Sequence, residues 1–452
     1  MNTKNITKIG LAALVAASVS MTSCKKGCTD ETAENYNEKA KKDDGSCTYA
    51  EEETNEVVSG TITANTTWTN DKIYELAGKV VVDNGATLTI EAGTIIKGQS
   101  GTGTNASALI IARGAKINAV GTASSPIIFT SVLDDIEIGQ TSGTNLDESD
   151  NGKWGGVIIL GYAQISAGDG DTESQIEGIP ATESYGTFGG SNDADNSGTM
   201  SYVSIRHGGA LIGAGNEING LTLGGVGSGT TLSNIEVVAN LDDGIELFGG
   251  TVDVDNLLIA FQGDDGIDID MNYSGTINNF VVLHGMDTDE GLEIDGPEGT
   301  TNTTGLFTLS NGTIWTTDGV GTGADLKSKA QGTISNVSWE GYSSKIVKIR
   351  ASFSDTVNCT DKSDAYTHMT SGTPTLTVAS SQFVSSTLSI SDVIDVYNGS
   401  VVLSSNDVCT TSQEATAESA VTTAGSSVVT SATVGATISS FSWTWANAKG
   451  KL

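Results

Sequence analysis

Carboxylates crowd one short stretch of the chain, Gly263–Asp270, which reads GDDGIDID. It holds four acidic side chains: Asp264, Asp265, Asp268 and Asp270. Like charges this close repel one another, and each carboxylate that loses its water is costly. Three kinds of chemistry fit such a stretch, namely a catalytic acid–base pair, a cation site, or the turn chemistry of a repeated structural unit.

The acidic stretch recurs along the chain with a period near 22 residues. DDGIEL (Asp242–Leu247) is followed by DDGIDI (Asp264–Ile269) and DEGLEI (Asp289–Ile294), and the first two begin 22 residues apart. Asparagines that follow an apolar residue and a small or polar one keep a similar step: Asn234, Asn256, Asn279, Asn311 and Asn336. Internal repetition at this spacing decides the architecture.

A repeat of about 22 residues with short β-like runs predicts an all-β fold, a parallel β-helix. Each coil is too thin to bury its own apolar residues, so stacked coils share one core. Each repeated Asn is expected in the left-handed region, with its amide laddered to the next coil. In IDID, alternation is expected to point Ile267 and Ile269 inward and Asp268 and Asp270 to solvent. A β-sandwich and a propeller are the alternatives, although a propeller blade needs about 40 residues.

The N-terminus predicts an exported, lipid-anchored protein. Lys4 and Lys8 precede the short apolar run Ile9–Val19, which is typical of an export signal over residues 1–23. The tetrapeptide MTSC that ends at Cys24 resembles a bacterial lipobox with Met in place of its usual Leu. That resemblance implies cleavage before Cys24 and acyl chains on Cys24 that bind the membrane. An ordinary secretory signal is the alternative.

The four cysteines after Cys24 predict two disulfides, because an even count in an exported protein is typical of disulfide pairing. Proximity in sequence favours Cys28–Cys47 and Cys359–Cys409. The first pair lies in a polar stretch, Gly27–Tyr49, that resembles a short module of exported Bacteroidota proteins. The resemblance implies a disulfide-closed acidic tether over residues 24–56.

The rest of the chain is predicted to form a β-helix and a terminal cap. The β-helix is expected over residues 57–405, with loop insertions near 134–153 and 168–198, where Gly, Ser, Asn and Asp accumulate. Residues 406–452 are predicted as a C-terminal strand or cap over the last coil. Trp443 and Trp445 alternate there, as two residues on one side of a strand would.

Several longer stretches carry a family resemblance. They are LIIARGAKINAVGTASSPIIFTS, GKWGGVIILGYA, MSYVSIRHGG, the pair DDGIELFGG and GDDGIDID, and FSWTWA. With them the chain resembles, over Val57–Leu452, the Bacteroidota lipoproteins with a right-handed parallel β-helix, a pectate-lyase-like superfold. The resemblance implies that fold and a surface-exposed outer-membrane lipoprotein, and it implies hardly anything about activity. Some such proteins are labelled multidrug transporters, a label that suits poorly a sequence with no membrane-spanning segment.

A polysaccharide-degrading enzyme is one functional hypothesis. Polygalacturonases and pectate lyases share the fold, and polygalacturonases place an Asp cluster, a DD pair, a His-Gly and a basic motif on successive coils. The matching candidates are Asp243, Asp264, Asp265 and His284, with the basic motif KIR at 348–350 several coils away. Such carboxylates could serve as general acid and water-activating base. However, no Lys or Arg occurs over residues 207–326, so the charged side chains that an anionic sugar would meet there are acidic and would repel it.

Cation binding is a second hypothesis. Stacked coils would bring Asp243, Asp265 and Glu290 to one turn, with Asp268 and Glu293 one strand further on. Hard carboxylate oxygens suit calcium, and a bound ion would offset the repulsion. The spacing nevertheless matches neither the nonapeptide calcium repeat nor an EF-hand loop. Turn chemistry is the third and favoured interpretation, in which Asp bonds its own backbone and Gly makes the turn.

Composition favours a binding role at the cell envelope. The net charge is −33, which excludes nucleic acid as a partner. The favoured function is non-enzymatic binding, adhesion or a structural role, with a polysaccharide or another envelope protein as the partner besides the membrane. Trp154, Tyr162 and Tyr185 could stack on sugar rings or pack inside the protein. Calcium is the one cofactor that the sequence suggests.

Overall fold

The chain divides into two compact units, Met1–Glu53 and Thr54–Leu452. The computed structural model describes residues 25–48, 55–168, 170–211, 218–355, 358–398 and 407–452. In the first unit a disulfide joins Cys28 to Cys47, which confirms this predicted pair. The two units are therefore a small disulfide-closed segment and a large β domain.

Two predictions about cysteines fall on parts of the chain without a structural description. Cys24 lies outside the described residues, and so does the side chain of Cys409. Lipidation of Cys24 and the pairing of Cys359 with Cys409 therefore stay predictions.

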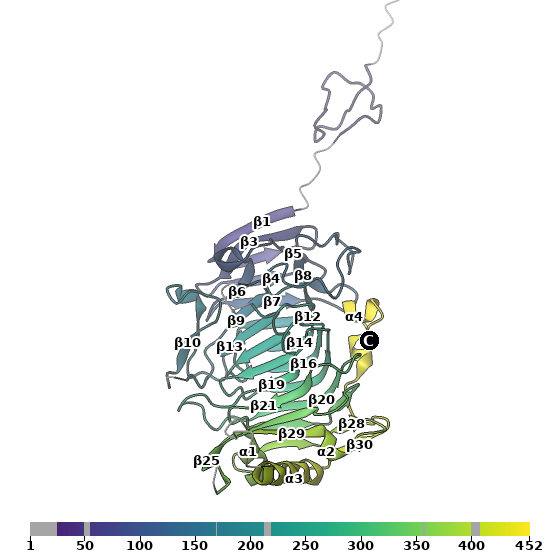
Figure 1. Ribbon diagram of the computed structural model, residues 1–452. Helices are drawn as coiled ribbons and strands as arrows, with labels where there is room; N and C mark the ends of the chain where they lie inside the picture. Colours follow the sequence, from purple (N-terminus) through teal and green to yellow (C-terminus); the bar gives the residue numbers. More distant parts are fainter. Residues whose placement is uncertain (1–24, 49–54, 169, 212–217, 356–357, 399–406) are drawn as a thin grey trace, which may run out of the picture. The chain divides into compact units, whose positions relative to one another are not determined.

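The large unit is built on one parallel sheet, in which 26 strands of the described residues take part (Figure 1). These strands stack in three columns along the molecule. The first column contains β2 (Thr66–Trp68), β4 (Thr87–Ile90), β7 (Lys116–Val120), β22 (Gly332–Ser335) and β27 (Leu376–Ala379). The second column contains β5 (Ile95–Gly98), β8 (Ile127–Ser131), β23 (Ser338–Glu340), β28 (Gln382–Val384) and β30 (Ser427–Val429).

Some strands bend from one column into the next. Those that join the first and second columns are β12 (Gly198–Arg206), β14 (Thr231–Val238), β16 (Asp253–Ala260), β18 (Thr276–Leu283) and β20 (Phe307–Trp315). Those that join the second and third columns are β1 (Asn55–Ile62) and β3 (Ile73–Val82). The rest of the third column comprises β6 (Ala108–Ile111), β9 (Val157–Leu160), β13 (Leu221–Gly224), β15 (Ile245–Phe248), β17 (Ile267–Asp270), β19 (Glu290–Ile294), β21 (Thr322–Leu326), β24 (Val347–Ala351) and β29 (Ile394–Asn398).

Shorter elements lie outside these columns. Two antiparallel pairs sit in the loops, formed by β10 (Glu173–Gln175) with β11 (Thr187–Gly189) and by β25 (Phe353–Asp355) with β26 (Thr360–Asp361). The helices of the described residues are α1 (Ala365–Ser371), α2 (Ile390–Val393), α3 (Asp407–Thr423), α4 (Trp445–Ala448), and the short 3-10 turns η1 (Gly103–Asn105), η2 (Ser184–Gly186) and η3 (Ile438–Phe441).

Successive coils stack in register, so like residues form continuous columns inside the protein. Ile245 of β15 pairs with Ile267 of β17, and Leu247 pairs with Ile269. All four side chains are buried in one hydrophobic core. This register is the one that the recurrence of DDGIEL and DDGIDI predicted, and it confirms the parallel β-helix. Strands inside the stack pair with the coils before and after them, which satisfies their backbone polar groups.

The repeated asparagines form the corner between the first two columns, as predicted. Their φ angles lie between 52° and 58°, in the left-handed region: Asn234, Asn256, Asn279, Asn311 and Asn336. The Nδ2 of Asn256 donates to Oδ1 of Asn234 over 3.2 Å, and the Nδ2 of Asn279 donates to Oδ1 of Asn256 over 2.5 Å. The ladder is interrupted after Asn279, because the Oδ1 of Asn279 accepts a hydrogen bond from the backbone N–H of Thr437 instead.

The C-terminal strap, residues 436–452, contains two short helical elements in the region where a terminal strand or cap was predicted. It contains η3 and α4, so Trp443 and Trp445 do not alternate along a strand. The buried carboxylate of Glu236 accepts hydrogen bonds from the backbone N–H groups of Trp445 (3.0 Å) and Ala446 (2.9 Å). These bonds, and burial of Trp445 against outward apolar residues of β14, β16 and β18, take the place of strand pairing. In Figure 1 this yellow segment runs beside β12, β14 and β16.

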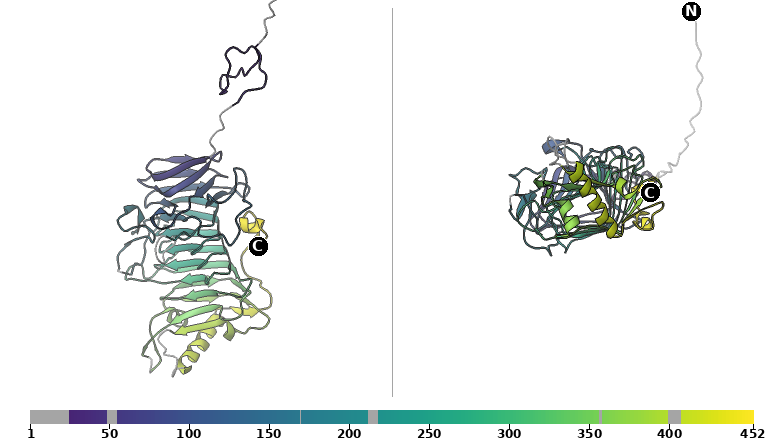
Figure 2. Two further views of the ribbon diagram at one scale, coloured as in Figure 1. Left: turned by 45° about the horizontal axis from the view of Figure 1, so that its top comes forward. Right: turned by 60° about the horizontal axis from the view of Figure 1, so that its bottom comes forward.

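Helix α3 covers the last coils of the β-helix. Its Ala417 and Val421 are buried in the same core as the strands, and Figure 2 shows the helix lying across the end of the stack. Among the helices of the described residues, none has the length and apolar character needed to cross a bilayer.

The asparagine ladder yields a prediction at Asn256. Asn256→Gly keeps the left-handed backbone but loses both amide contacts, so we expect the free energy of unfolding to fall by about 1–2 kcal/mol. Asn256→Val adds a β-branched residue to the left-handed region, for a further loss of about 1–2 kcal/mol. Urea denaturation followed by circular dichroism measures both losses, and a valine variant as stable as the wild type would contradict the ladder.

Candidate functional site

The acidic pairs occupy the corner between the second and third columns. The Oδ1 of Asp243 accepts a hydrogen bond from the backbone N–H of Asp265 over 2.9 Å. The Oδ1 of Asp265 accepts in turn from the backbone N–H of Glu290 over 2.8 Å. Asp243 and Asp265 are both buried. Their carboxylates therefore hold the corner of the following coil, whereas the sequence predicted a bond to their own backbone.

The same burial changes the acidity of these corner residues. Removal from water, and then the neighbouring carboxylate of Asp243, raises the pKa of Asp265 to about 11. Burial, followed by repulsion from Asp242, also raises the pKa of Asp243 well above its usual range. Both groups thus favour a neutral or ion-bound form over a bare charge.

The outward face of the third column is covered by other parts of the chain, although its acidic residues were predicted to face solvent. Asp268 points away from the core, but only 8% of it is exposed, and Glu246 one coil earlier is equally buried. The predicted insertion after β9 folds back over this face, where the ring of its Phe188 lies 5.9 Å from that of Phe248. Ile165, which precedes that insertion, packs in the same cluster. The expectation that Asp268 faces solvent is therefore wrong.

Three buried carboxylates meet beneath this cover. Asp243, Glu246 and Asp268 each offer an oxygen within 4.8 Å of the others, close enough to share one metal ion. Glu246 also accepts a hydrogen bond from the side-chain amide of Asn219. The sequence pattern named Asp243 and Asp268 as cation ligands but missed Glu246, although Glu246 precedes Asp268 by 22 residues and holds the same position one coil earlier.

The other three predicted cation ligands have different partners. Asp265 bonds the backbone, as described above. Glu290 lies 3.0 Å from the Nζ of Lys348, and Glu293 lies 2.5 Å from the Nζ of Lys327. The calcium site predicted over all five residues stays a prediction, and the geometry gathers only Asp243 and Asp268 of that set into one cluster.

The candidate catalytic residues fall into two groups. Asp264 lies exposed beside the buried Asp243 and Asp265 at the acidic corner. His284 is buried, with its Nε2 3.0 Å from the hydroxyl of Tyr342, and burial lowers its pKa to about 4. It lines a recess of about 540 Å³ whose described lining residues do not include any of the three aspartates.

The basic motif at 348–350 lies on the strand next to the last of the acidic strands. The outward residues Asp268, Glu293, Asp325 and Lys348 follow one another in register on β17, β19, β21 and β24. The Nζ of Lys348 lies 2.8 Å from Asp325. A lysine therefore follows three acidic residues on the outward side of this column, directly beside Asp325.

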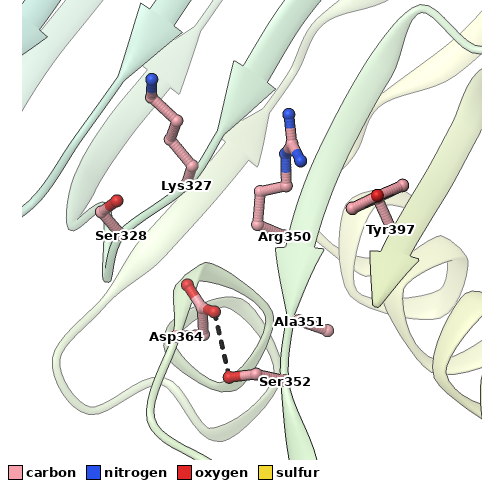
Figure 3. Close-up of a pocket in the computed structure, with 7 residues that line it drawn as sticks. All are labelled: Lys327, Ser328, Arg350, Ala351, Ser352, Asp364 and Tyr397. Carbon is pink, nitrogen blue, oxygen red and sulfur yellow. Dashed lines mark hydrogen bonds between the residues drawn. The ribbon is translucent and has the colours of Figure 1, made fainter. Parts of the chain in front are cut away.

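An open recess of about 390 Å³ adjoins this charged network. Its lining, which defines the Arg350 recess, comprises Lys327, Ser328, Arg350, Ala351, Ser352, Asp364 and Tyr397. Figure 3 shows Lys327 and Arg350 extending in the same direction, with Tyr397 beside Arg350. The guanidinium carbon of Arg350 lies 4.6 Å from the centre of the Tyr397 ring. Half of Tyr397 stays exposed, at 50%.

Carboxylates fix the cations of the Arg350 recess. Arg350 donates through Nε and Nη2 to both oxygens of Asp325, over 2.9 and 2.5 Å. Burial alone would raise the pKa of Asp325, but hydrogen bonds from Arg350 and Lys348 outweigh it and lower that pKa. Burial likewise opposes the charge on Lys327, yet the carboxylates of Asp295 and Glu293 raise its pKa. Asp325, Lys327 and Arg350 therefore favour their charged forms near neutral pH.

Sequence reasoning missed the aromatic half of this recess. Tyr397 follows Arg350 by 47 residues, which is far from the 22-residue step, so the repeat pattern could not align them. The only available signal was the alternation in IDVYN (Ile394–Asn398), which matches that of VKIRA (Val347–Ala351). Of the aromatics that were considered for sugar stacking, Trp154 is fully buried, and Tyr162 is 38% exposed beneath Arg113.

Comparison with known proteins identifies the β domain. The family model described as a pectate-lyase like beta helix domain matches residues 60–446. No curated protein gives a significant match, and no solved structure does either.

The corner hydrogen bonds yield a prediction at Asp265. Asp265→Asn keeps an oxygen for the backbone N–H of Glu290 and removes a carboxyl group that is costly to bury in its charged form, so we expect stability equal to or above that of the wild type. Asp265→Ala leaves the buried N–H unpaired, and the free energy of unfolding should fall by about 1–3 kcal/mol. Chemical denaturation compares the two variants, and equal destabilisation by both would show that the charge itself matters.

Proposed function

This chain belongs to the family of pectate-lyase-like β-helix domains, and on that premise we propose that it binds a neutral glycan in the Arg350 recess without cleaving it. The stacked pair of Arg350 and Tyr397 carries the proposal. Arg350 holds the ring of Tyr397 in place from one side, while half of that tyrosine remains exposed to solvent. A fixed, half-exposed aromatic ring suits the apolar face of a sugar and loses little entropy on binding.

The polar lining matches the hydroxyl groups of such a sugar. Lys327 and Arg350 donate hydrogen bonds only, whereas the carboxylate of Asp364 accepts them. Asp364 is itself held by Ser352, whose hydroxyl donates to it over 3.2 Å (Figure 3). It also caps α1 by accepting from the backbone N–H of Ala365. Sugar hydroxyls both donate and accept, so a preorganised mixed lining fits them.

Charge supports a neutral ligand over an acidic one. Each cation near the recess already has a carboxylate partner: Lys327 pairs with Glu293 and Asp295, and Arg350 pairs with Asp325. The chain as a whole carries a net charge of −33, which repels polyanions over long range. A polyuronate would therefore find little unpaired positive charge in this recess.

The state of the candidate catalytic groups supports binding without cleavage. Asp243 and Asp265 are buried and hydrogen-bonded to the backbone of the next coil. A general acid or base must reach the scissile bond directly or through one water molecule. Carboxylates that hold a corner and lie beneath the surface are poorly placed for that role.

Binding by the Arg350 recess is tested by Tyr397→Ala. Loss of the ring should weaken binding to a neutral oligosaccharide identified on a glycan array by about tenfold, as measured by titration calorimetry. Tyr162→Ala is the matched control, because Tyr162 also lies beneath an arginine, Arg113, at 4.7 Å. We expect that variant to bind like the wild type.

Three outcomes would contradict the proposal. Binding that survives Tyr397→Ala would place the ligand elsewhere. A preference for polygalacturonate over neutral glycans would contradict the charge argument. New reducing ends released from any polysaccharide of the panel by the wild type would support the alternative, a polysaccharide-degrading enzyme.

We further propose that the protein works at the cell envelope, as a surface-exposed outer-membrane lipoprotein anchored through Cys24. The Cys28–Cys47 disulfide supports an oxidising compartment. The lipobox-like MTSC supports the anchor. Mass spectrometry of the mature N-terminus should find acyl chains on Cys24, and Cys24→Ser should move the protein out of the membrane fraction. A mature chain in the membrane fraction with an unmodified Cys24 would contradict the anchor.

A further inference from the structure

We propose that Asp243, Glu246 and Asp268 form a buried site for a divalent cation, with calcium as the ion that their chemistry favours. Asn219 adjoins the site as a further oxygen donor. This site lies at the acidic corner and beneath the β9 insertion, and none of its residues lines the Arg350 recess. The proposal therefore does not depend on glycan binding.

The spacing of the oxygens fits one ion. One oxygen from each of the three carboxylates lies within 4.8 Å of the other two. Calcium binds oxygens at about 2.3–2.6 Å, so two ligands on opposite sides of the ion are about 4.6–5.2 Å apart. Magnesium binds at about 2.0–2.1 Å and demands near-ideal octahedral geometry. The larger and more tolerant ion suits three side chains from two successive coils.

Two oxygens at the site lack partners. Within the described part of the chain, the Oδ1 of Asp268 is buried and accepts no hydrogen bond, and the same holds for the Oδ1 of Asn219. Asp268 is more than nine-tenths buried. A buried polar atom without a partner is costly, and a cation would satisfy the oxygen of Asp268 directly and that of Asn219 once its amide is turned. Turning the Asn219 amide by half a turn would place its oxygen beside Glu246, where its nitrogen now lies.

The lysines near the site form ion pairs with other acidic residues. Lys327 pairs with Glu293 and Asp295, and Lys348 pairs with Glu290 and Asp325. The ion pairs of both lysines therefore lie outside the cluster of Asp243, Glu246 and Asp268, and the unpartnered oxygens of the site favour a bound ion.

A route from solvent leads to the site along the acidic corner. Asp242, Asp243 and Asp264 form a second group whose oxygens also lie within 4.8 Å of one another. Asp264 is exposed and Asp242 is half-buried, while Asp243 belongs to both groups. An incoming ion could thus exchange its water for carboxylate oxygens step by step, which avoids crossing an apolar barrier.

Calorimetry with calcium alone tests the site directly. The purified chain is stripped with EDTA, desalted and titrated with calcium chloride, and we expect one ion per chain. Asp268→Asn and Glu246→Gln should each lower the affinity by about tenfold or more, because the charge count of the ligands sets calcium affinity. Asp255→Asn is the matched control: Asp255 is an exposed acid of β16 and lies outside both oxygen groups. Its affinity should equal that of the wild type.

Thermal melting separates an ion site from a merely structural cluster. Calcium should raise the melting temperature of the wild type more than that of Asp268→Asn, which binds the ion more weakly. In EDTA, by contrast, we expect Asp268→Asn to melt at a higher temperature than the wild type, because the variant has one carboxylate fewer in the buried cluster. If Asp268→Asn does not fold, Glu246→Gln provides the same comparison.

Two results would overturn the proposal. If calcium, magnesium and manganese produce neither heat nor a shift in the melting temperature of the wild type, protons alone neutralise the cluster. If Asp268→Asn and Glu246→Gln bind calcium as tightly as the wild type does, the ion occupies another part of the chain.

Discussion

In-register stacking of the coils is the constraint on which the rest of this structure depends. Each coil presents the same corner residues at the same height, so side chains of one coil meet the backbone or side chains of the next. The asparagine amides do this at one corner, and the carboxylates of Asp243 and Asp265 do it at another. A slip of one residue would break both ladders and turn the core residues outward.

Stacking also concentrates charge, because a residue that recurs at one position forms a column of like groups about 5 Å apart. The outward side of the third column shows two solutions to this problem. Toward its far end, Lys348 joins the column itself and pairs with Asp325. In the middle, Glu246 and Asp268 are buried next to Asp243 with no lysine in the cluster. The first solution leaves a fixed polar network beside the Arg350 recess, and the second leaves a cluster that requires protons or an ion.

Segments outside the repeat decide which faces stay accessible. The insertion after β9 packs against Phe248 and removes the middle of the third column from water. The C-terminal strap covers outward apolar residues of β14, β16 and β18, and it is held there by Glu236. Tyr397 and Arg350 lie further along the third column, where a recess opens to solvent. The segments outside the 22-residue repeat therefore determine which polar side chains of the β-helix solvent can reach.

The sequence by itself determined the parallel β-helix, the left-handed asparagine corner and the Cys28–Cys47 pair, because each depends on a short motif or a constant period. It placed Asp243 and Asp268 near one another for the same reason. Only the tertiary structure decided that Asp268 is buried, that the C-terminal strap is helical, and that Tyr397 lies beneath Arg350. Each of these depends on contacts between segments whose separation does not follow the repeat, such as Phe188 with Phe248 or Glu236 with Trp445. Periodicity fixes which residues stack, but it carries no information about what an irregular insertion will cover.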